Sequence, residues 1–203
     1  MNKEKAKVHI IYAHPSRKSV TCDIKEAYIR GLEEKSIEYT LTDLYESNFN
    51  ADISEEEYLR ENNNVSFPLS EDVRMEQEMI NNSNVLTFIF PLFWMDAPSK
   101  LVGYFTRVFT KGFRYGYDDG TKETMNVMRE VNFLISAGSG FEDLKKDGKV
   151  KALETIFVKD RLAGKTEKSR LYFFTETTFK KEKELNNRPK YVKYAQKIGR
   201  NTI

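Results

Sequence analysis

The chain has 203 residues, enough to bury a sizeable core, and we expect residues 1–203 to form a single domain. Its 33 basic and 31 acidic side chains leave a net charge of +2, which gives no general argument for nucleic acid as a partner. No apolar run reaches the roughly 18 residues of a membrane span, and Met1–Lys7 does not resemble a signal peptide. With one cysteine, Cys22, and two histidines, the sequence disfavours disulfides and zinc, so we expect a cytoplasmic protein without a metal.

Five apolar segments have the length of strands. They are expected at Val8–Ala13, Ile37–Thr42, Val85–Phe90, Val131–Ser136 and Leu171–Thr175. The first, third and fourth are almost continuously apolar, which is typical of parallel strands buried on both faces. The second alternates between apolar and polar residues, which places it nearer an edge of the sheet.

Apolar side chains recur at helical spacing between these strands. Helices are expected at Thr21–Lys35, Ser70–Asn82, Pro98–Phe109, Phe141–Lys146, Val150–Leu162 and Pro189–Ile198. Pro98 and Pro189 are placed at helix starts, where proline is well tolerated. The acidic stretch Glu55–Asn64 is interpreted as a surface excursion. The alternation of strands and helices predicts an open parallel α/β sheet with helices on both faces.

The loop after the first strand has the composition of an anion site. Residues His14–Thr21 combine hydroxyls with cations and open into a helix, whose N-terminal amides and dipole favour a phosphate. The lack of glycine disfavours both the triphosphate-binding loop and the dinucleotide fingerprint. An ordinary strand-to-helix turn with Ser19 as N-cap accounts for the same residues, so this stretch alone leaves both interpretations open.

Two further strand ends complete the pattern. Ligands of open α/β sheets bind beyond the carboxyl ends of the strands. The third strand is followed by Pro91–Pro98, which carries large apolar side chains, and the fourth by Ser136–Gly140, whose glycines allow close backbone approach. Core packing explains an aromatic run taken alone. The three strand ends together indicate a ligand with a phosphate at one end and a flat apolar ring, such as an isoalloxazine, at the other.

Several motifs occur in collinear order along most of the chain. They are Ala13-His14-Pro15-(x)3-Ser19, Asp43-Leu44-Tyr45-(x)3-Phe49-Asn50, Phe90-Pro91-Leu92-Phe93-Trp94-Met95-Asp96-Ala97-Pro98, Gly112-Phe113-(x)-Tyr115-(x)-Tyr117 and the small-residue loop Ser136–Gly140. By these motifs the sequence resembles the flavodoxin-like NAD(P)H:quinone oxidoreductases, which include quinone reductases and modulator-of-drug-activity proteins. The resemblance implies a flavodoxin-like, doubly wound, five-stranded parallel sheet of order 2-1-3-4-5.

The resemblance also implies a flavin site. The positions that match the family's phosphate loop are His14, Lys18, Ser19, Val20 and Thr21. Those that match the segments on either side of the isoalloxazine are Pro91, Leu92, Phe93, Trp94 and Met95, and Ser136, Ala137, Gly138 and Ser139. Trp94 and Met95 would also wall the substrate pocket, which Tyr115 and Tyr117 of the second protomer of a homodimer would cap.

The activity implied by the resemblance is passage of hydride from NAD(P)H, through FMN or alternatively FAD, to a quinone-like acceptor by ping-pong kinetics. Reduction of nitro or azo compounds, and a regulatory or electron-carrier role, are the alternatives. The sequence assigns no catalytic residue. The family's histidine after the second flavin loop has no counterpart in Phe141–Asp147, where Lys145 or Lys146 could supply positive charge instead.

Overall fold

The computed structural model describes residues 5–62, 67–116, 120–177 and 181–202. At its centre is a parallel sheet of order β2-β1-β3-β4-β5. Its strands are β1 (Lys7–Tyr12), β2 (Glu38–Asp43), β3 (Val85–Pro91), β4 (Glu130–Ser136) and β5 (Ser169–Phe174). The predicted fold class and strand order are confirmed, with β2 at an edge.

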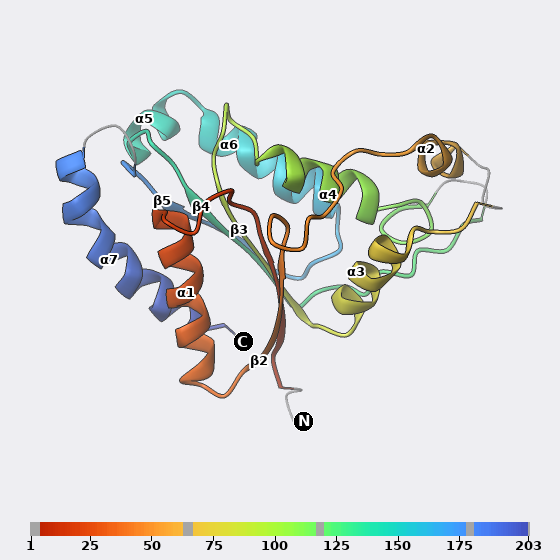
Figure 1. Cartoon of the computed structure of the whole chain (residues 1–203), viewed down its shortest axis with the longest axis horizontal. Coiled ribbons are helices and arrows are strands. Elements are labelled where there is room, and N and C mark those ends of the chain that lie inside the picture. The colour runs from red at the N-terminus through yellow and green to blue at the C-terminus, as the bar shows by residue number, and fades with distance from the viewer. Residues whose placement is uncertain (1–4, 63–66, 117–119, 178–180, 203) are drawn as a thin grey trace.

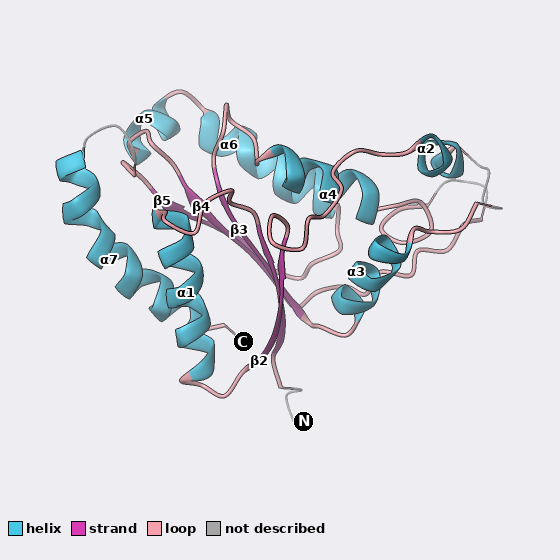
Figure 2. Ribbon diagram, in the orientation of Figure 1, coloured by secondary structure: helices cyan, strands magenta, loops and turns pink. Residues whose placement is uncertain are grey.

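Helices cover both faces of this sheet (Figures 1 and 2). On one face lie α1 (Val20–Glu33) and α7 (Lys181–Arg200). The remaining helices are α2 (Glu55–Glu61), α3 (Glu71–Asn81), α4 (Ser99–Val108), α5 (Phe141–Lys146), α6 (Lys149–Glu154) and the π-helix η1 (Thr155–Leu162). Of these, α3, α4, α6 and η1 pack on the opposite face. None of the described helices is long and apolar enough to cross a lipid bilayer.

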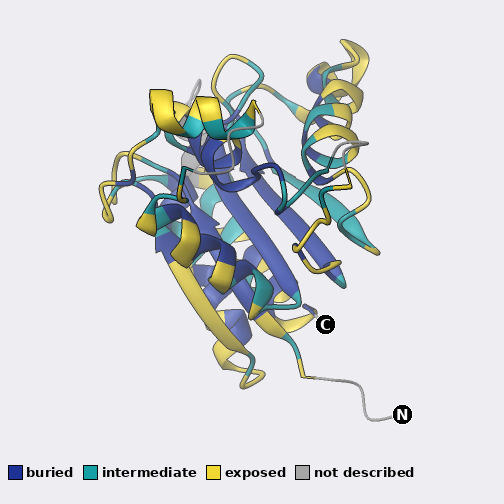
Figure 3. Ribbon diagram, turned by 90° about the vertical axis from the view of Figure 1, so that its right-hand side faces the viewer, coloured by how far each residue is buried: buried dark blue, intermediate teal, exposed yellow. Residues whose placement is uncertain are grey.

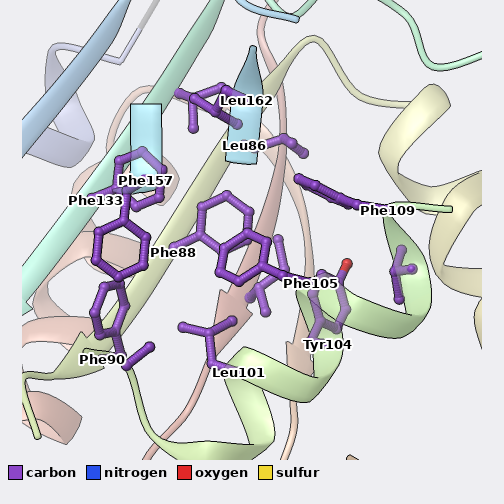
Figure 4. Packing of buried hydrophobic residues seen from close by; sticks show 14 of the residues in the cluster. Leu86, Phe88, Phe90, Leu101, Tyr104, Phe105, Phe109, Phe133, Phe157 and Leu162 are labelled. Atoms are coloured by element: carbon purple, nitrogen blue, oxygen red, sulfur yellow. The ribbon is translucent and has the colours of Figure 1, made fainter. Parts of the chain in front are cut away.

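Aromatic rings fill the core between the sheet and α4. Phe88 of β3 and Phe133 of β4 stack with their centroids 5.1 Å apart, and Phe105 of α4 and Phe157 of η1 pack against them (Figure 4). Figure 3 shows that the inner strands β1, β3 and β4 are buried, whereas the edge strand β2 is mostly exposed. This rigid layer lies directly behind the loops that leave β3 and β4.

Close helix contact secures the opposite face. A Cβ on Gly31 of α1 would lie 2.2 Å from the carbonyl oxygen of Gln196, and one on Gly199 of α7 would lie 2.2 Å from that of Tyr28. Only glycine permits this approach. The crossing therefore holds α7 against α1, whose N-terminus borders the carboxyl end of the sheet.

Two helices differ from the expectations. Residues 55–61, interpreted as part of a surface excursion, do lie at the surface but form the helix α2. The side chain of Ser54 accepts from Glu57 N, and that of Glu57 accepts from Ser54 N. No residue of α2 is buried, so it lacks the apolar spacing that would reveal it. The last helix starts at Lys181 rather than at Pro189, and Arg188 in the part before the proline donates to Asp23 of α1.

Two other expectations needed smaller corrections. Pro98 is the N-cap of α4 rather than its first helical residue. The helix expected at Val150–Leu162 is divided into α6 and η1, and a π-helix of this kind often marks a functional region.

A buried arginine attaches α2 to the rest of the fold. Arg107 of α4 is 5% exposed and donates to both carboxylate oxygens of Glu57, to both of Asp72 and to the carbonyl oxygen of Asn50, at 2.6–3.1 Å. Burial raises the pKa of Glu57, but hydrogen bonds from Arg107, with those from Ser54 and Ser70, outweigh it and hold the pKa below its ordinary value.

We predict that Arg107→Met lowers the free energy of unfolding by about 3 kcal/mol, because it leaves the mostly buried Glu57 carboxylate without its cation. Urea unfolding followed by circular dichroism measures the change. Arg74→Met, which breaks ion pairs on the exposed face of α3, is the matched control and should leave the unfolding midpoint unchanged. Equal midpoints for the two variants would contradict this role of Arg107.

Candidate functional site

A cavity of about 830 Å³ lies beyond the carboxyl ends of β1, β3 and β4. The three loops that follow these strands form its walls. All fourteen residues expected to bind a cofactor line it: His14, Lys18, Ser19, Val20, Thr21, Pro91, Leu92, Phe93, Trp94, Met95, Ser136, Ala137, Gly138 and Ser139. The structure therefore brings together three segments that lie more than 40 residues apart in the sequence.

The N-terminus of α1 forms an anion-binding wall. Ser19 is both its N-cap and a lining residue, so the two interpretations of this loop are compatible, and its hydroxyl oxygen accepts from Cys22 N at 3.1 Å. Among the described residues no acceptor contacts the amide nitrogens of Val20 and Thr21. The exposed Lys18 adds a positive charge beside them. Free amide groups, the helix dipole and the positive charge of Lys18 together favour binding of a phosphate.

His14 lies at the entrance to this wall with its ring held locally. Its Nδ1 is 2.9 Å from Ser16 N and 2.8 Å from Ser16 O, so it accepts from the amide when unprotonated and donates to the carbonyl when protonated. Burial lowers the pKa of His14, partly offset by the Ser16 carbonyl and the charge of Asp43. The ring is accordingly neutral at pH 7 and offers a hydrogen bond rather than a positive charge.

Ser136, the last residue of β4, joins the three walls. Its carbonyl oxygen accepts from Leu92 N at 2.7 Å, and its hydroxyl lies 2.7 Å from that of Thr21. Ala137 N in turn donates to Phe174 O of β5 at 2.8 Å. These bonds fix the loops after β3 and β4 relative to the N-terminus of α1.

The loop after β3 contains a tight, strained turn. Phe93 and Asp96 exchange backbone hydrogen bonds of 2.8 and 2.9 Å, and the residues between them, Trp94 and Met95, have φ of 49° and 67°. Such turns favour Asn-Gly, and each larger residue in the left-handed region costs about 1–2 kcal/mol. The turn projects Trp94 fully into solvent over the cavity mouth. Strain of this kind is found at binding sites.

Of the two tyrosines expected to cap the substrate site of a second protomer, Tyr115 lies among the described residues. Tyr115 is not among the residues that line this cavity, and its hydroxyl donates to Glu61 of α2 at 2.6 Å. Tyr117 lies outside the described residues. Contact of these residues with a second protomer therefore stays a prediction.

Sequence reasoning missed three residues of the cavity wall: Leu144, Lys149 and Thr177. Neither Lys145 nor Lys146 lines the cavity, whereas Lys149, at the start of α6, does and is paired with Asp147 at 2.7 Å. Gly148, with a φ of 70°, makes the turn that places Lys149 there. That glycine was the available signal in the sequence.

A parallel sheet of order 2-1-3-4-5 with a cavity beyond its carboxyl ends defines a protein of the flavodoxin-like class. The flavodoxin-like fold family matches residues 6–164, and the chain belongs to this family.

Its relatives agree with the resemblance predicted from the motifs. The chain is 32% identical over 150 residues to an uncharacterized NAD(P)H oxidoreductase of Haemophilus influenzae, a match that covers 73% of each chain. It is 35% identical to NAD(P)H dehydrogenase (quinone) 1 of Cavia porcellus over 53% of this chain and 44% of that one. The match thus spans about half the length of the mammalian relative.

Solved structures extend the comparison. The NAD(P)H:quinone oxidoreductase of Methanothermobacter marburgensis shares 36% identity and a TM-score of 0.87 over 98% of this chain and 97% of that one. An FMN-dependent NADH-azoreductase of Bacillus anthracis, in complex with FMN, has 17% identity and a TM-score of 0.63 over 96% and 99% of the two chains. The second likeness shows the fold alone.

We predict that the pKa of His14 in the ligand-free protein lies below 6.5, its ordinary value, because partial burial disfavours the charged ring. Since the folded state then binds fewer protons than the unfolded state, this residue reduces stability as the pH falls below about 6.5. Nuclear magnetic resonance titration of the ring protons measures the midpoint, and His14→Asn assigns the signal against that of His9. A midpoint at or above 6.5 would show that the ring is more solvated than the structure indicates.

Proposed function

We propose that the chain is a flavin-dependent oxidoreductase that carries hydride from NAD(P)H to a quinone-like acceptor. The observation that carries this proposal is the single cavity in which an anion-binding helix terminus and a wall of large apolar side chains face the same space. A flavin phosphate and isoalloxazine have these two chemistries in one molecule.

The residues present fit such a cofactor. The amides of Val20 and Thr21, with Lys18 and Ser19, would hold the phosphate. The loops at 91–95 and 136–139 would flank the isoalloxazine. Bound there, the flavin would supply the redox chemistry, accepting electrons from the nicotinamide and delivering them to the acceptor, while the protein orients the reactants.

FMN is the cofactor that we favour over FAD. The described cavity offers one anion-binding terminus and one apolar region, which match a phosphate and a ring. No separate adenine site is evident among its lining residues. The fold neighbour from Treponema denticola, a general stress protein, also has FMN in its solved structure.

One cavity implies that donor and acceptor use the same space in turn, which is the basis of ping-pong kinetics. The mouth is open beside the fully exposed Trp94, so a flat reactant can lie against the ring and leave. An open mouth of this kind also admits nitro or azo compounds, and three fold neighbours are azoreductases. Reduction of such compounds is the second candidate activity.

A homodimer would complete the mouth of the site. Tyr115 is held by Glu61 on the side of the fold where α2 and α3 leave Tyr58 and Met75 exposed, at 58% and 51%. Covering such side chains is the usual gain from self-association. In the proposed assembly Tyr115 of one protomer approaches the cavity of its partner.

The first test is the purified protein itself. We expect it to be yellow or to bind added FMN, to lose its absorbance near 450 nm when NADH or NADPH is added anaerobically, and to recover it with a quinone. Val20→Asp, which places a carboxylate at the anion-binding terminus, should weaken FMN binding by at least tenfold, about 1.4 kcal/mol. A protein that binds neither FMN nor FAD would exclude the proposal.

The second prediction concerns charge at the cavity wall. Positive charge stabilises the reduced form of a bound flavin, which carries more negative charge than the oxidised form. Lys149→Met should therefore lower the midpoint potential of the bound flavin by about 30 mV, equivalent to about 1.4 kcal/mol. Asp147→Asn removes the partner of Lys149 and should shift the potential the other way.

Spectroelectrochemistry of the flavin-loaded protein measures both potentials. Lys145→Met, a change to a lysine of α5 outside the cavity wall, is the matched control. Shifts of the same sign for the Lys149 and Asp147 variants would rule out this electrostatic role.

A further inference from the structure

An ion pair from a distant helix holds the side chain that closes the strained turn at 93–96. Asp96 Oδ1 accepts from Ala97 N at 2.7 Å and from Arg161 Nη2 at 3.1 Å. Asp96 is the residue directly after Trp94 and Met95, whose left-handed backbone the turn must maintain. The two short backbone bonds of the turn are local, whereas the ion pair with Arg161 joins its last residue, Asp96, to η1.

Arg161 is itself fixed in place. Its side chain is 13% exposed, and its guanidinium carbon lies 4.6 Å from the ring centroids of both Phe105 and Phe157. These rings belong to the aromatic core (Figure 4), so cation–π contacts as well as charge hold the guanidinium of Arg161. A guanidinium constrained on two sides can hold a carboxylate in one position, unlike an exposed ion pair.

The backbone that carries Arg161 is held as well. Arg161 lies near the C-terminus of η1, and its carbonyl oxygen accepts from Arg114 Nε at 2.8 Å. Its Nη1 is buried and has no acceptor among the described residues. A buried charged donor without a partner reduces stability, which argues that this arginine is placed for more than packing.

We propose that Arg161 is a positioning residue that acts through Asp96: it holds the strained turn so that Trp94 and Met95 keep a fixed orientation at the cavity mouth. The proposal rests on the proposed function in taking the ring that these side chains face to be a flavin. Without Arg161 the turn relaxes from its left-handed conformation. The loss of flavin affinity then arises at the ring end of the cavity, whereas the phosphate end, which is formed by α1, is unaffected.

Trp94 reports on the turn without any ligand, because it is the single tryptophan of the chain. Time-resolved fluorescence anisotropy of the ligand-free protein should show the amplitude of its sub-nanosecond motion rising at least twofold in Arg161→Met. Asp96→Asn, which keeps the acceptor for Ala97 N but loses the charge, should do the same. The double variant should add little to either change, since both remove one interaction, and Arg161→Lys should restore most of the rigidity.

The flavin supplies the second readout. We expect Arg161→Met to weaken binding of riboflavin, which lacks the phosphate, by about as large a factor as binding of FMN, roughly tenfold or 1.4 kcal/mol. A loss confined to FMN would place the effect at the phosphate and overturn the proposal.

Arg170→Met is the matched control, since it breaks a partly buried arginine–carboxylate pair with Glu130 at the opposite end of the sheet. It should lower stability and leave the anisotropy of Trp94 unchanged. Unchanged anisotropy in Arg161→Met, or an equal increase in Arg170→Met, would overturn the positioning role. If the unsubstituted protein binds no flavin, the proposed function fails, and the anisotropy still decides whether Arg161 holds the turn.

Discussion

The two hydrogen bonds of Ser136 are the constraint on which the site depends. One joins the end of β4 to Leu92 in the loop after β3, and the other joins it to Thr21 at the start of α1. Ser136 and Thr21 are both 3% exposed, so water does not compete for these bonds. These two bonds fix the distance between the anion-binding N-terminus of α1 and the apolar loop after β3, because both are joined to the end of β4. The shape of the cavity is therefore a consequence of the sheet rather than of the loops alone.

The fold also supports a turn that its own residues disfavour. Trp94 and Met95 occupy a conformation that glycine and asparagine prefer, and the strain persists only because the surroundings restrict the alternatives. Pro91 and Leu92 are tied to β4 on one side, and Asp96 caps Ala97 ahead of α4 on the other. Behind the turn lies the ring layer of the core. The core and the ends of the loop thus restrict the turn that carries the exposed Trp94.

The sequence predicted what depends on local pattern. Apolar runs predicted the five strands, and the composition of three strand-end loops predicted one ligand site, because parallel strands bring their carboxyl ends to one edge. The resemblance to the quinone oxidoreductases supplied the fourteen residues, all of which line the cavity. It could not predict what depends on distant partners. Helix α2 has no buried face and is held by Arg107, 50 residues away. Lys149 and Thr177 reach the cavity only through the packing of later segments, and the part of α7 before Pro189 contacts α1 through Arg188 and Asp23.

The two ends of the cavity differ in their charge. Lys18 lies beside free backbone amides and has no ion-pair partner among the described residues, so its charge is available to an anion. Lys149 is paired with Asp147, which cancels much of its field in solvent. The unpaired positive charge therefore lies at the helix terminus, where it favours binding of a phosphate. At the ring end, affinity must come mainly from apolar contact, and the orientation of Trp94 and Met95 decides how much contact is made.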